Sequence, residues 1–320
     1  MEWRSELDEW LEKHLVCPRD RKHVEKDGDN LRCPAGHEYP IIDGIPVLRI
    51  DGVPRIRHNV TSLVGDDESP DKIDPYVQHI IAATNGLLYL PMVNRLETYP
   101  IPSLPLPAAP RPDLRFLDIG CNWGRWCISS ARGGYVPVGI DHRLDALQAA
   151  RRVAQQLGVS ASYVVADAQR LPFDASCFDV VFSYSVLQHF DKEVARQVLE
   201  ECARTVVEDG TCTIQMPNSF GIRNLYVQIK RRYREPKNFE VRYWRISELT
   251  EAFNNIIGPT SIFVEGYFGL GVGASASDNQ LPARYRSVVK LSELLRGLSK
   301  KIPLMRNLAD SVYVQAKRTV

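Results

Sequence analysis

A regular alternation of apolar and amphipathic segments, beginning at Leu114, is the feature that most constrains the fold of this chain. Short runs rich in β-branched and aromatic residues occur at 114–120, 135–141, 162–167, 178–185 and 211–218. The segments 124–134, 143–158 and 191–206 lie between such runs and place apolar residues at helical spacing. Apolar strands that alternate with amphipathic helices form a parallel sheet with helices on both faces. The pattern therefore predicts an α/β domain.

The same alternation continues toward the C-terminus, with two interruptions. A helix and then two strands are expected at 245–255, 260–268 and 310–318. Two longer segments, 219–243 and 267–308, interrupt these elements. Insertions at such points usually build the substrate side of an α/β enzyme. We therefore assign residues 111–320 to one main domain that contains both insertions.

The first 110 residues have a different character. Residues 1–50 begin with a short helix at 7–15 and continue with two Cys-Pro pairs, a turn and short β-branched runs. Such a composition is typical of a small unit of strands and knuckles. Residues 51–110 are expected to form a linker and a cap helix. The stretch 100–113 has six prolines, which predicts a stiff, extended chain.

Composition narrows the class of protein. The net charge is only +1, which argues against a protein whose main partner is bulk nucleic acid. No apolar run approaches the roughly twenty residues that cross a membrane. The N-terminus is charged and amphipathic rather than signal-like, so a cytoplasmic location is expected. The seven cysteines are odd in number, and we expect reduced thiols.

The segment 115–126, RFLDIGCNWGRW, has the pattern of a strand, a tight turn and the start of a helix. Parallel sheets bind ligands at the carboxyl ends of strands where the strand order reverses. The turn contains Gly120 and Gly124, with Asn122 between them, and asparagine is the next-best residue after glycine for a left-handed backbone. Because the dinucleotide fingerprint G-x-G-x-x-G is absent, the turn favours a nucleoside over a pyrophosphate.

Two further acids fit a nucleoside. Asp141 ends the second strand about 20 residues after Gly120, where a carboxylate takes ribose hydroxyls. Asp167 ends the third strand, where it could accept a hydrogen bond from an adenine amino group. A single aspartate after a strand is more often a helix cap or turn former. With Asp118, however, three acids stand at successive strand ends beside a glycine turn, and this set favours a nucleoside site.

In their order and spacing, these motifs resemble the class I S-adenosylmethionine (SAM)-dependent methyltransferases. The matching stretches are LDIGCNWG, VGIDH, ADAQRLPF and FDVVFSYSVLQHF, followed by FVEGYF and DSVYVQAKR near the C-terminus. The resemblance implies SAM as cofactor and a Rossmann-like, seven-stranded sheet closed by an antiparallel strand pair.

The same resemblance implies the residues that hold SAM. They are Asp118, Gly120, Asn122, Gly124, Asp141, Asp167 and Ala168. Asp118 and Gly120 would line the methionine part, Asp141 the ribose, and the last two the adenine edge. Asn122 departs from the family, because many members have glycine there.

Transfer of a methyl group to a hydroxyl requires alignment of the nucleophile, exclusion of water and a base. We expect His189 to be that base, since the resemblance implies that the loop after the fourth strand opens beside the sulfonium. In another interpretation His189 caps the helix that starts near Asp191, or packs over the cofactor. Tyr184, in the same loop, is the weaker candidate because tyrosines at strand ends more often pack.

The N-terminal unit carries a pattern of metal ligands. Its members are Cys17, Asp20, Cys33 and His37, and thiolate, imidazole and carboxylate all bind zinc. The unit also resembles the short zinc-ribbon domain found alone or fused to some methyltransferases. Asp20 stands where that family has a second knuckle cysteine, and His23 is an alternative ligand. The prediction is a structural zinc, and the alternative is a ribbon that keeps its shape without metal.

The two insertions bear on the acceptor. Residues 226–245 interleave seven basic residues with aromatics, which is typical either of a solvated face or of a site for an acidic or phosphate-bearing acceptor. Residues 288–308 are amphipathic and basic, as in helices that lie on anionic membranes, although a lid over the site fits equally well.

We therefore expect a methyltransferase that acts on a small-molecule or glycan/lipid-linked acceptor, at a hydroxyl. The alternative is a ribosomal RNA methyltransferase that uses the N-terminal ribbon for recognition. The near-zero net charge and the sequence SYSVLQHF, in place of an Asn/Asp-Pro-Pro-Tyr type motif, make nucleic acid the less favoured partner. A non-catalytic nucleoside-binding subunit is the third interpretation. The sequence does not indicate the oligomeric state.

Overall fold

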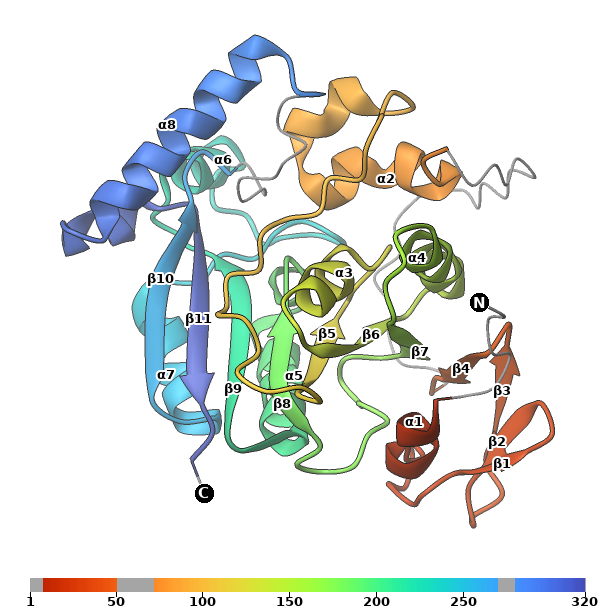
Figure 1. The fold of residues 1–320 in the computed structure, drawn as a ribbon. Coiled ribbons are helices and arrows are strands. Elements are labelled where there is room, and N and C mark those ends of the chain that lie inside the picture. Colours follow the sequence, from red (N-terminus) through yellow and green to blue (C-terminus); the bar gives the residue numbers. More distant parts are fainter. Residues whose placement is uncertain (1–7, 51–71, 270–279, 320) are drawn as a thin grey trace.

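The computed structural model describes residues 8–50, 72–269 and 280–319. Its centre is a sheet in which seven strands of the main domain lie in the order β7-β6-β5-β8-β9-β11-β10 (Figure 1). Their bounds are Arg115–Ile119 (β5), Val136–Asp141 (β6), Ser162–Ala166 (β7), Phe178–Ser183 (β8), Val206–Pro217 (β9), Thr260–Gly266 (β10) and Ser311–Lys317 (β11). Strands β5 to β9 run parallel, and β11 is antiparallel to both β9 and β10. The predicted α/β sheet and its closing antiparallel pair are confirmed.

The strand order reverses beside β5. Strands β6 and β7 follow on one side of β5, whereas β8 lies on its other side. The last residue of β5, Ile119, pairs with Ile140 of β6 and with Ser183 of β8, so these three strands end at the same level. Ligands bind at such a switch point, outside the carboxyl ends of the strands. The fold therefore places the turn after β5, the end of β6 and the loop after β8 around one crevice.

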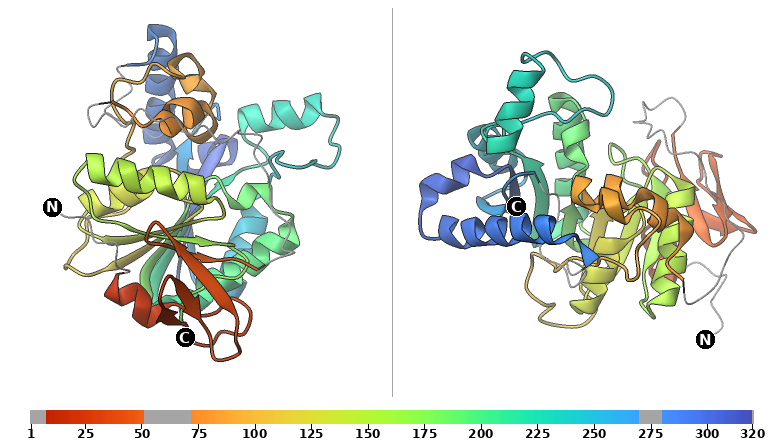
Figure 2. Two further views of the ribbon diagram at one scale, coloured as in Figure 1. Left: turned by 90° about the vertical axis from the view of Figure 1, so that its right-hand side faces the viewer. Right: turned by 90° about the horizontal axis from the view of Figure 1, so that it is seen from above.

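Helices cover both faces of the sheet. On one face lie α3 (Arg125–Arg132) and α4 (Leu144–Gln156), and on the other lie α5 (Lys192–Thr205) and α7 (Ile246–Ile256) (Figure 2, left). Along α4, Leu147, Ala150, Val153 and Ala154 are buried, as their spacing predicts, whereas Leu144 at its start is half-buried. Because both faces are covered, the central strands are apolar on both sides, and β5 has four buried residues in succession.

A cap and two insertions lie beyond the carboxyl ends of the parallel strands (Figure 1, top). They contain α2 (Pro75–Asn85), η1 (Leu87–Met92), α6 (Ile222–Lys230), α8 (Ala283–Ser299) and η4 (Pro303–Leu308). The Asp74 carboxylate caps α2 and also binds Arg152 of α4, 2.7 Å away, which fixes the cap to the domain. The expected linker over 51–71, and residues 270–279 of the second insertion, lie outside the described residues. None of the helices in the described ranges has the length and apolarity needed to cross a membrane.

The N-terminal unit is joined to the central sheet, which the sequence pattern did not predict. It consists of α1 (Glu9–His14), β1 (Glu25–Asp27), β2 (Asn30–Arg32), β3 (Glu38–Ile42) and β4 (Ile45–Leu48). The first four strands form antiparallel pairs, but β4 also pairs in parallel with β7, with Val47 opposite Val165. The unit thus extends the sheet at its β7 edge and covers an otherwise open row of backbone groups.

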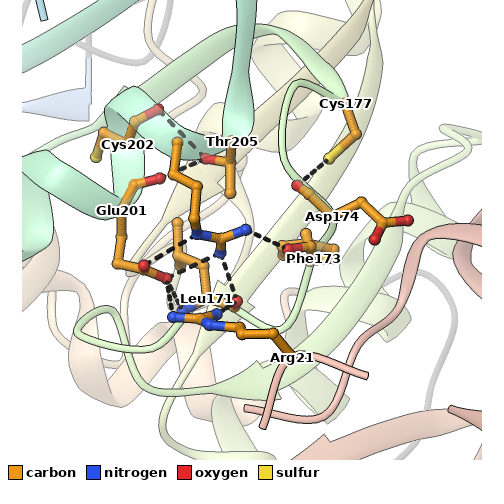
Figure 3. A network of polar contacts seen from close by, with 9 residues as sticks. Arg21, Leu171, Phe173, Asp174, Cys177, Glu201, Cys202 and Thr205 are labelled. Carbon is orange, nitrogen blue, oxygen red and sulfur yellow. Dashed lines mark hydrogen bonds and ion pairs between the residues drawn. The ribbon is translucent and has the colours of Figure 1, made fainter. Parts of the chain in front are cut away.

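A half-buried ionic network also fixes this unit to the main domain (Figure 3). Glu201 of α5 lies 2.8 Å from Arg21 and 2.9 Å from Arg204, and it accepts the backbone N–H of Leu171. Arg204 also donates to the carbonyl of Phe173. Burial alone would raise the pKa of Glu201, but the two guanidinium groups lower it below its usual value. One carboxylate therefore holds together the N-terminal unit, α5 and the loop before β8.

We expect Glu201→Gln to lower the free energy of unfolding by about 1–3 kcal/mol near neutral pH, because two partly buried guanidinium groups lose their counter-ion. A carboxylate whose pKa is lowered stabilises the fold above its unfolded pKa and loses this effect as the pH falls through the folded pKa. The difference between variant and wild type should therefore shrink in acid, as measured by urea unfolding. Glu200→Gln, at the exposed neighbouring position, is the matched control. A variant as stable as this control would contradict the assigned role.

Candidate functional site

A cavity opens at the carboxyl ends of β5, β6, β7 and β8, at the predicted switch point. Its walls are the turn after β5, the residues that follow β6 and β7, and the loop at 184–190 after β8. Thr84 of the cap helix and Phe239 of the first insertion complete the enclosure. The Trp123 indole N–H donates to the Thr84 hydroxyl at 3.1 Å, so the cap is bonded directly to the turn.

The turn after β5 has the left-handed backbone that its sequence predicts. Gly120, Asn122 and Gly124 have φ angles of 74°, 47° and 78°. A Cβ at Gly120 would lie 2.3 Å from Cγ2 of Val186, in the loop after β8. Glycine is therefore required at this position both for its conformation and for the close approach of the two loops. Asn122 closes the turn by accepting the N–H of Trp123 with its side-chain oxygen, at 2.8 Å.

Asp141 joins two walls of the cavity. Its carboxylate accepts the backbone N–H groups of Asn122, at 3.1 Å, and of Arg143, at 3.0 Å. The His142 ring lies 3.3 Å away; its burial alone would lower its pKa, but the hydrogen bond and charge of Asp141 raise it. Asp167, 7% exposed, and Ala168 line the cavity beyond the end of β7. The structure thus gathers Gly120, Asn122, Asp141, Asp167 and Ala168 around one space.

Two residues expected in the cofactor site lie outside the cavity wall. Asp118 is 1% exposed and accepts a hydrogen bond from the Cys127 thiol at 3.5 Å, beneath the turn. Alternate side chains of a strand point to opposite faces, and Asp118 points toward α3. Burial raises the pKa of Asp118 to about 7. Gly124 faces the Tyr163 hydroxyl, which a Cβ would meet at 2.7 Å, so it shapes the turn and does not line the cavity.

His189 lines the cavity from η2 (Leu187–His189). Its Nδ1 lies 2.9 Å from the carbonyl oxygen of Phe239, and its ring stacks on the Phe239 ring at 3.6 Å between centroids. A carbonyl can only accept, so in the neutral ring Nδ1 carries the proton and Nε2 carries the lone pair. The Gln188 amide lies 3.2 Å from Nε2. His189 does not cap α5, and Asp191 at the cap position makes no capping bond because its carboxylate pairs with Arg242 at 2.6 Å.

Sequence reasoning missed several cavity residues, among them Thr84, Arg125 and Phe239. Phe239 and Thr84 come from segments with no local motif, and only the fold carries them to the site. Arg125 follows the glycine turn directly, so its proximity to a ligand could have been inferred. Tyr184, the weaker candidate base, donates its hydroxyl to Glu265 at 3.1 Å, and burial raises its pKa.

The predicted metal ligands form a separate cluster within the N-terminal unit. Ligand atoms of Cys17, Asp20, Cys33 and His37 all lie within 4.8 Å of one another. His37 Nδ1 is 3.4 Å from the Cys17 sulfur, 3.3 Å from the Cys33 sulfur and 3.6 Å from the Asp20 carboxylate. His23, the alternative ligand, is not part of this cluster. Two thiols, one imidazole and one carboxylate match the ligand types and number of a closed zinc site.

Comparison with known proteins assigns the central part of the chain. Residues 116–210, which span β5 to the start of β9, match the family model described as a methyltransferase domain. They form a SAM-dependent methyltransferase domain. The domain includes the glycine turn, Asp141, Asp167 and His189, whereas the N-terminal unit and both insertions lie outside the match.

Parts of the chain are similar to several known proteins. The ubiquinone biosynthesis O-methyltransferase of Brucella ovis is 38% identical over 85 residues, which are 26% of this chain and 34% of that protein. The protein of the same name from Chelativorans sp. (strain BNC1) is 34% identical over 107 residues, or 33% of this chain and 41% of that protein. The chain thus spans about a third of the length of these curated relatives. A SAM-dependent methyltransferase from Archaeoglobus fulgidus has a TM-score of 0.43 at 19% identity, covering 64% of this chain and 86% of that chain.

We expect Gly120→Ala in the methyltransferase domain to weaken the binding of S-adenosylhomocysteine (SAH), the demethylated cofactor, because the added Cβ forces apart the turn and Val186. Gly158→Ala is the matched control, since Gly158 also has a positive φ, 62°, but nothing lies within 4 Å of its Cβ position. Both variants carry a backbone strain of about 1–2 kcal/mol. Calorimetry should show reduced SAH affinity only for Gly120→Ala. Equal affinities in the two variants would contradict the close-approach argument.

A second prediction concerns Asp118. A carboxyl whose pKa is raised on folding stabilises the fold below its unfolded pKa, and this effect is lost as the pH rises through the folded pKa. The contribution of Asp118 to stability therefore falls as the pH rises from about 4 to about 7, and we expect the stability of Asp118→Asn relative to wild type to rise over the same range. Urea unfolding at both ends of this range tests it, with Asp113→Asn at the exposed position before β5 as control. An unchanged pH dependence in Asp118→Asn would refute the prediction.

Proposed function

We propose that the protein transfers a methyl group from SAM to a hydroxyl of a small-molecule or glycan/lipid-linked acceptor. The observation that carries this proposal is that one cavity contains both the glycine turn with its aspartates and the Nε2 lone pair of His189. A nucleoside-binding module without catalytic function would not need an oriented imidazole at the same cavity.

The cofactor half of the cavity fits SAM. Gly120 and Asn122 of the turn line the cavity, and Asp141 is held at the end of β6 by two backbone N–H groups. We assign the ribose hydroxyls to Asp141 and the adenine edge to Asp167 and Ala168, with the methionine part along Gly120. SAM, when bound, supplies a methyl group activated by its sulfonium.

His189 acts as the base in this proposal. The Phe239 carbonyl holds the proton on Nδ1, so Nε2 could take the proton of the acceptor hydroxyl, whose oxygen would receive the methyl group as the methyl–sulfur bond of SAM breaks. The Gln188 amide nitrogen lies 3.2 Å from the same nitrogen and donates to the Ser185 hydroxyl at 2.6 Å, so in this proposal it keeps the bond to Ser185 when the acceptor hydroxyl takes its place at His189. The apolar rings of Phe239 and Trp126 exclude water from this end of the cavity.

The comparisons support the hydroxyl as acceptor group. The curated relatives named above are O-methyltransferases, but the similarity to them covers the cofactor half of the domain. The acceptor would be selected by the insertions and by the cap, which contribute Phe239 and Thr84 to the cavity.

The first experiment is transfer of radiolabelled methyl from SAM into a cell extract that is then separated into small-molecule, lipid/glycan, RNA and protein fractions. Label in the small-molecule or lipid/glycan fraction, lost in Asp141→Ala, would support the proposal. Label confined to RNA would replace it by the RNA methyltransferase alternative. Absence of transfer together with absence of SAH binding would leave a non-catalytic protein.

We expect His189→Gln to lower the rate of methyl transfer about 10²–10⁴-fold, the usual effect of losing a general base, while leaving SAH affinity within about twofold. Single-turnover transfer and calorimetry measure the two quantities separately. His79→Gln, on the exposed side of α2, controls for the loss of an imidazole. A His189 variant that transfers methyl at the rate of this control would exclude the base role.

A structural zinc in the N-terminal unit is a second proposal, supported by the clustering of Cys17, Asp20, Cys33 and His37. We expect about one zinc per chain by elemental analysis, and a lower melting temperature after chelation because a structural metal stabilises only the folded form. Cys33→Ser should abolish the metal, whereas Cys177→Ser, outside the cluster, should retain it. A metal-free wild type with an unchanged melting temperature would establish the ribbon as metal-independent.

A further inference from the structure

Arg125 is a buried cation in the cavity wall. It is the first residue of α3, is 6% exposed, and lies over the faces of Trp126 and Tyr184, at 5.7 Å and 5.0 Å from the ring centroids. With the rest of the described chain it forms neither an ion pair nor a side-chain hydrogen bond. Burial lowers its pKa, which shows how unfavourable this environment is for the charge. A buried guanidinium without a counter-ion costs free energy that an anionic ligand would recover.

The acids near Arg125 do not take the place of such a ligand. Glu265 is engaged by the Tyr184 hydroxyl, and its own burial raises its pKa and so favours its neutral form. Asp118 is bonded to the Cys127 thiol on the other side of the turn. Neither carboxylate lies within ion-pair distance of the guanidinium. The positive end of α3 faces the cavity beside Arg125 and adds to the same field.

We propose that Arg125 binds a carboxylate of a ligand in this cavity. The carboxylate belongs either to the amino-acid part of the cofactor or to an acidic acceptor, and a planar guanidinium is suited to either source. The aromatic faces of Trp126 and Tyr184 keep the guanidinium in position, so that its donors are oriented before the ligand arrives. This inference rests on the proposed function, because it assigns a subsite within the same cavity.

Calorimetry with three ligands distinguishes the two sources of the carboxylate. The ligands are SAH, 5′-methylthioadenosine, which lacks the carboxylate, and benzoate added to the SAH complex. If the cofactor carboxylate is bound, Arg125→Gln lowers SAH affinity about 30-fold or more and leaves methylthioadenosine within about twofold. If the acceptor is bound, SAH affinity is unchanged and benzoate binding is lost. Arg125→Lys, which keeps the charge, should restore part of the affinity.

The matched control is Arg132→Gln at the exposed end of the same helix. The carboxylate subsite is refuted if SAH and benzoate both bind to Arg125→Gln as they do to the control. It is also refuted if benzoate does not bind to wild type and Arg125→Gln leaves the SAH affinity unchanged. Loss of methylthioadenosine binding in a properly folded Arg125→Gln would also refute it. Binding of methylthioadenosine to wild type tests the nucleoside site separately. If methylthioadenosine and SAH both fail to bind to wild type, the proposed function fails, whatever Arg125 does.

A second, independent observation concerns the surface formed by the two insertions. Most exposed large apolar side chains of the described residues are found there. They are Phe220, Ile222, Tyr226, Ile229, Tyr233, Leu291, Leu294, Leu298, Ile302, Leu304 and Leu308. Positions 222, 226, 229 and 233 share one face of α6 and its C-terminal turn, and 291, 294 and 298 share one face of α8. Asn218, just before α6, donates to the Asn307 carbonyl at 2.8 Å, so η4 of the second insertion is bonded to the chain at the start of the first. We call the exposed apolar side chains of the two insertions together the insertion surface.

The insertion surface is also strongly basic. Residues 220–237 and 283–308 contain thirteen lysines and arginines but two glutamates, in a chain whose net charge is +1. Exposed apolar side chains between basic ones are suited to the interface of an anionic bilayer, where apolar groups enter the acyl boundary and the cations face the headgroups. The segment after α6 also supplies Phe239 to the cavity, so the surface borders the site.

We propose that the insertion surface docks on an anionic lipid membrane and presents the cavity to acceptors held there. Sedimentation with phosphatidylglycerol-containing vesicles should show binding that falls in high salt, with little binding to pure phosphatidylcholine vesicles. Ile229→Ser combined with Leu294→Ser should lower the bound fraction at least about fivefold. Leu90→Ser, at an exposed apolar position outside this surface, should leave it unchanged.

Equal binding of both vesicle types, or none, would refute membrane docking. If the wild type has the mass of two chains in solution and the double variant has the mass of one, the insertion surface binds a second copy of the chain instead. Both outcomes can be read without methyl transfer, so they remain separate from the test of the proposed function.

Discussion

The site depends on one steric constraint, the absence of a side chain at Gly120. The turn after β5 can approach Val186 only because no Cβ stands between them, and this contact closes the crevice where the strand order reverses. Asp141 then bonds the backbone of the same turn to the end of β6. Cofactor residues and the candidate base therefore share one cavity because two loops from neighbouring parallel strands touch.

Electrostatics within this region are unusual for a protein interior. Arg125 and Asp118 are both buried on either side of the turn, yet neither has an ion-pair partner among the described residues, and the pKa of each is shifted toward its neutral form by burial. Such shifts concentrate at functional sites, where charges are held for ligands and not for stability. By contrast, Glu201 is fully engaged by two guanidinium groups and serves to dock the N-terminal unit.

The parts outside the matched domain have distinct physical roles. The N-terminal unit continues the sheet through β4 and carries the four-ligand cluster away from the cavity. The insertions contribute little to the sheet, but one supplies Phe239 to His189, and together they hold most of the exposed apolar side chains. In the proposed function, the sheet and its glycine turn would therefore bind the cofactor, and the added segments would select the acceptor.

The sequence by itself determined the α/β architecture, the left-handed turn at Gly120 and Asn122, and the clustering of Asp141 and Asp167, because these follow from local periodicity and from strand ends that must meet at one edge. The four candidate ligands Cys17, Asp20, Cys33 and His37, which the sequence pattern singled out, also lie together in the structure. Only the tertiary structure decided that β4 pairs with β7, that Asp118 points beneath the cavity, and that Phe239 fixes the tautomer of His189. These contacts join segments distant in the chain, and no local pattern of residues specifies which distant partner a backbone edge or a side chain will find.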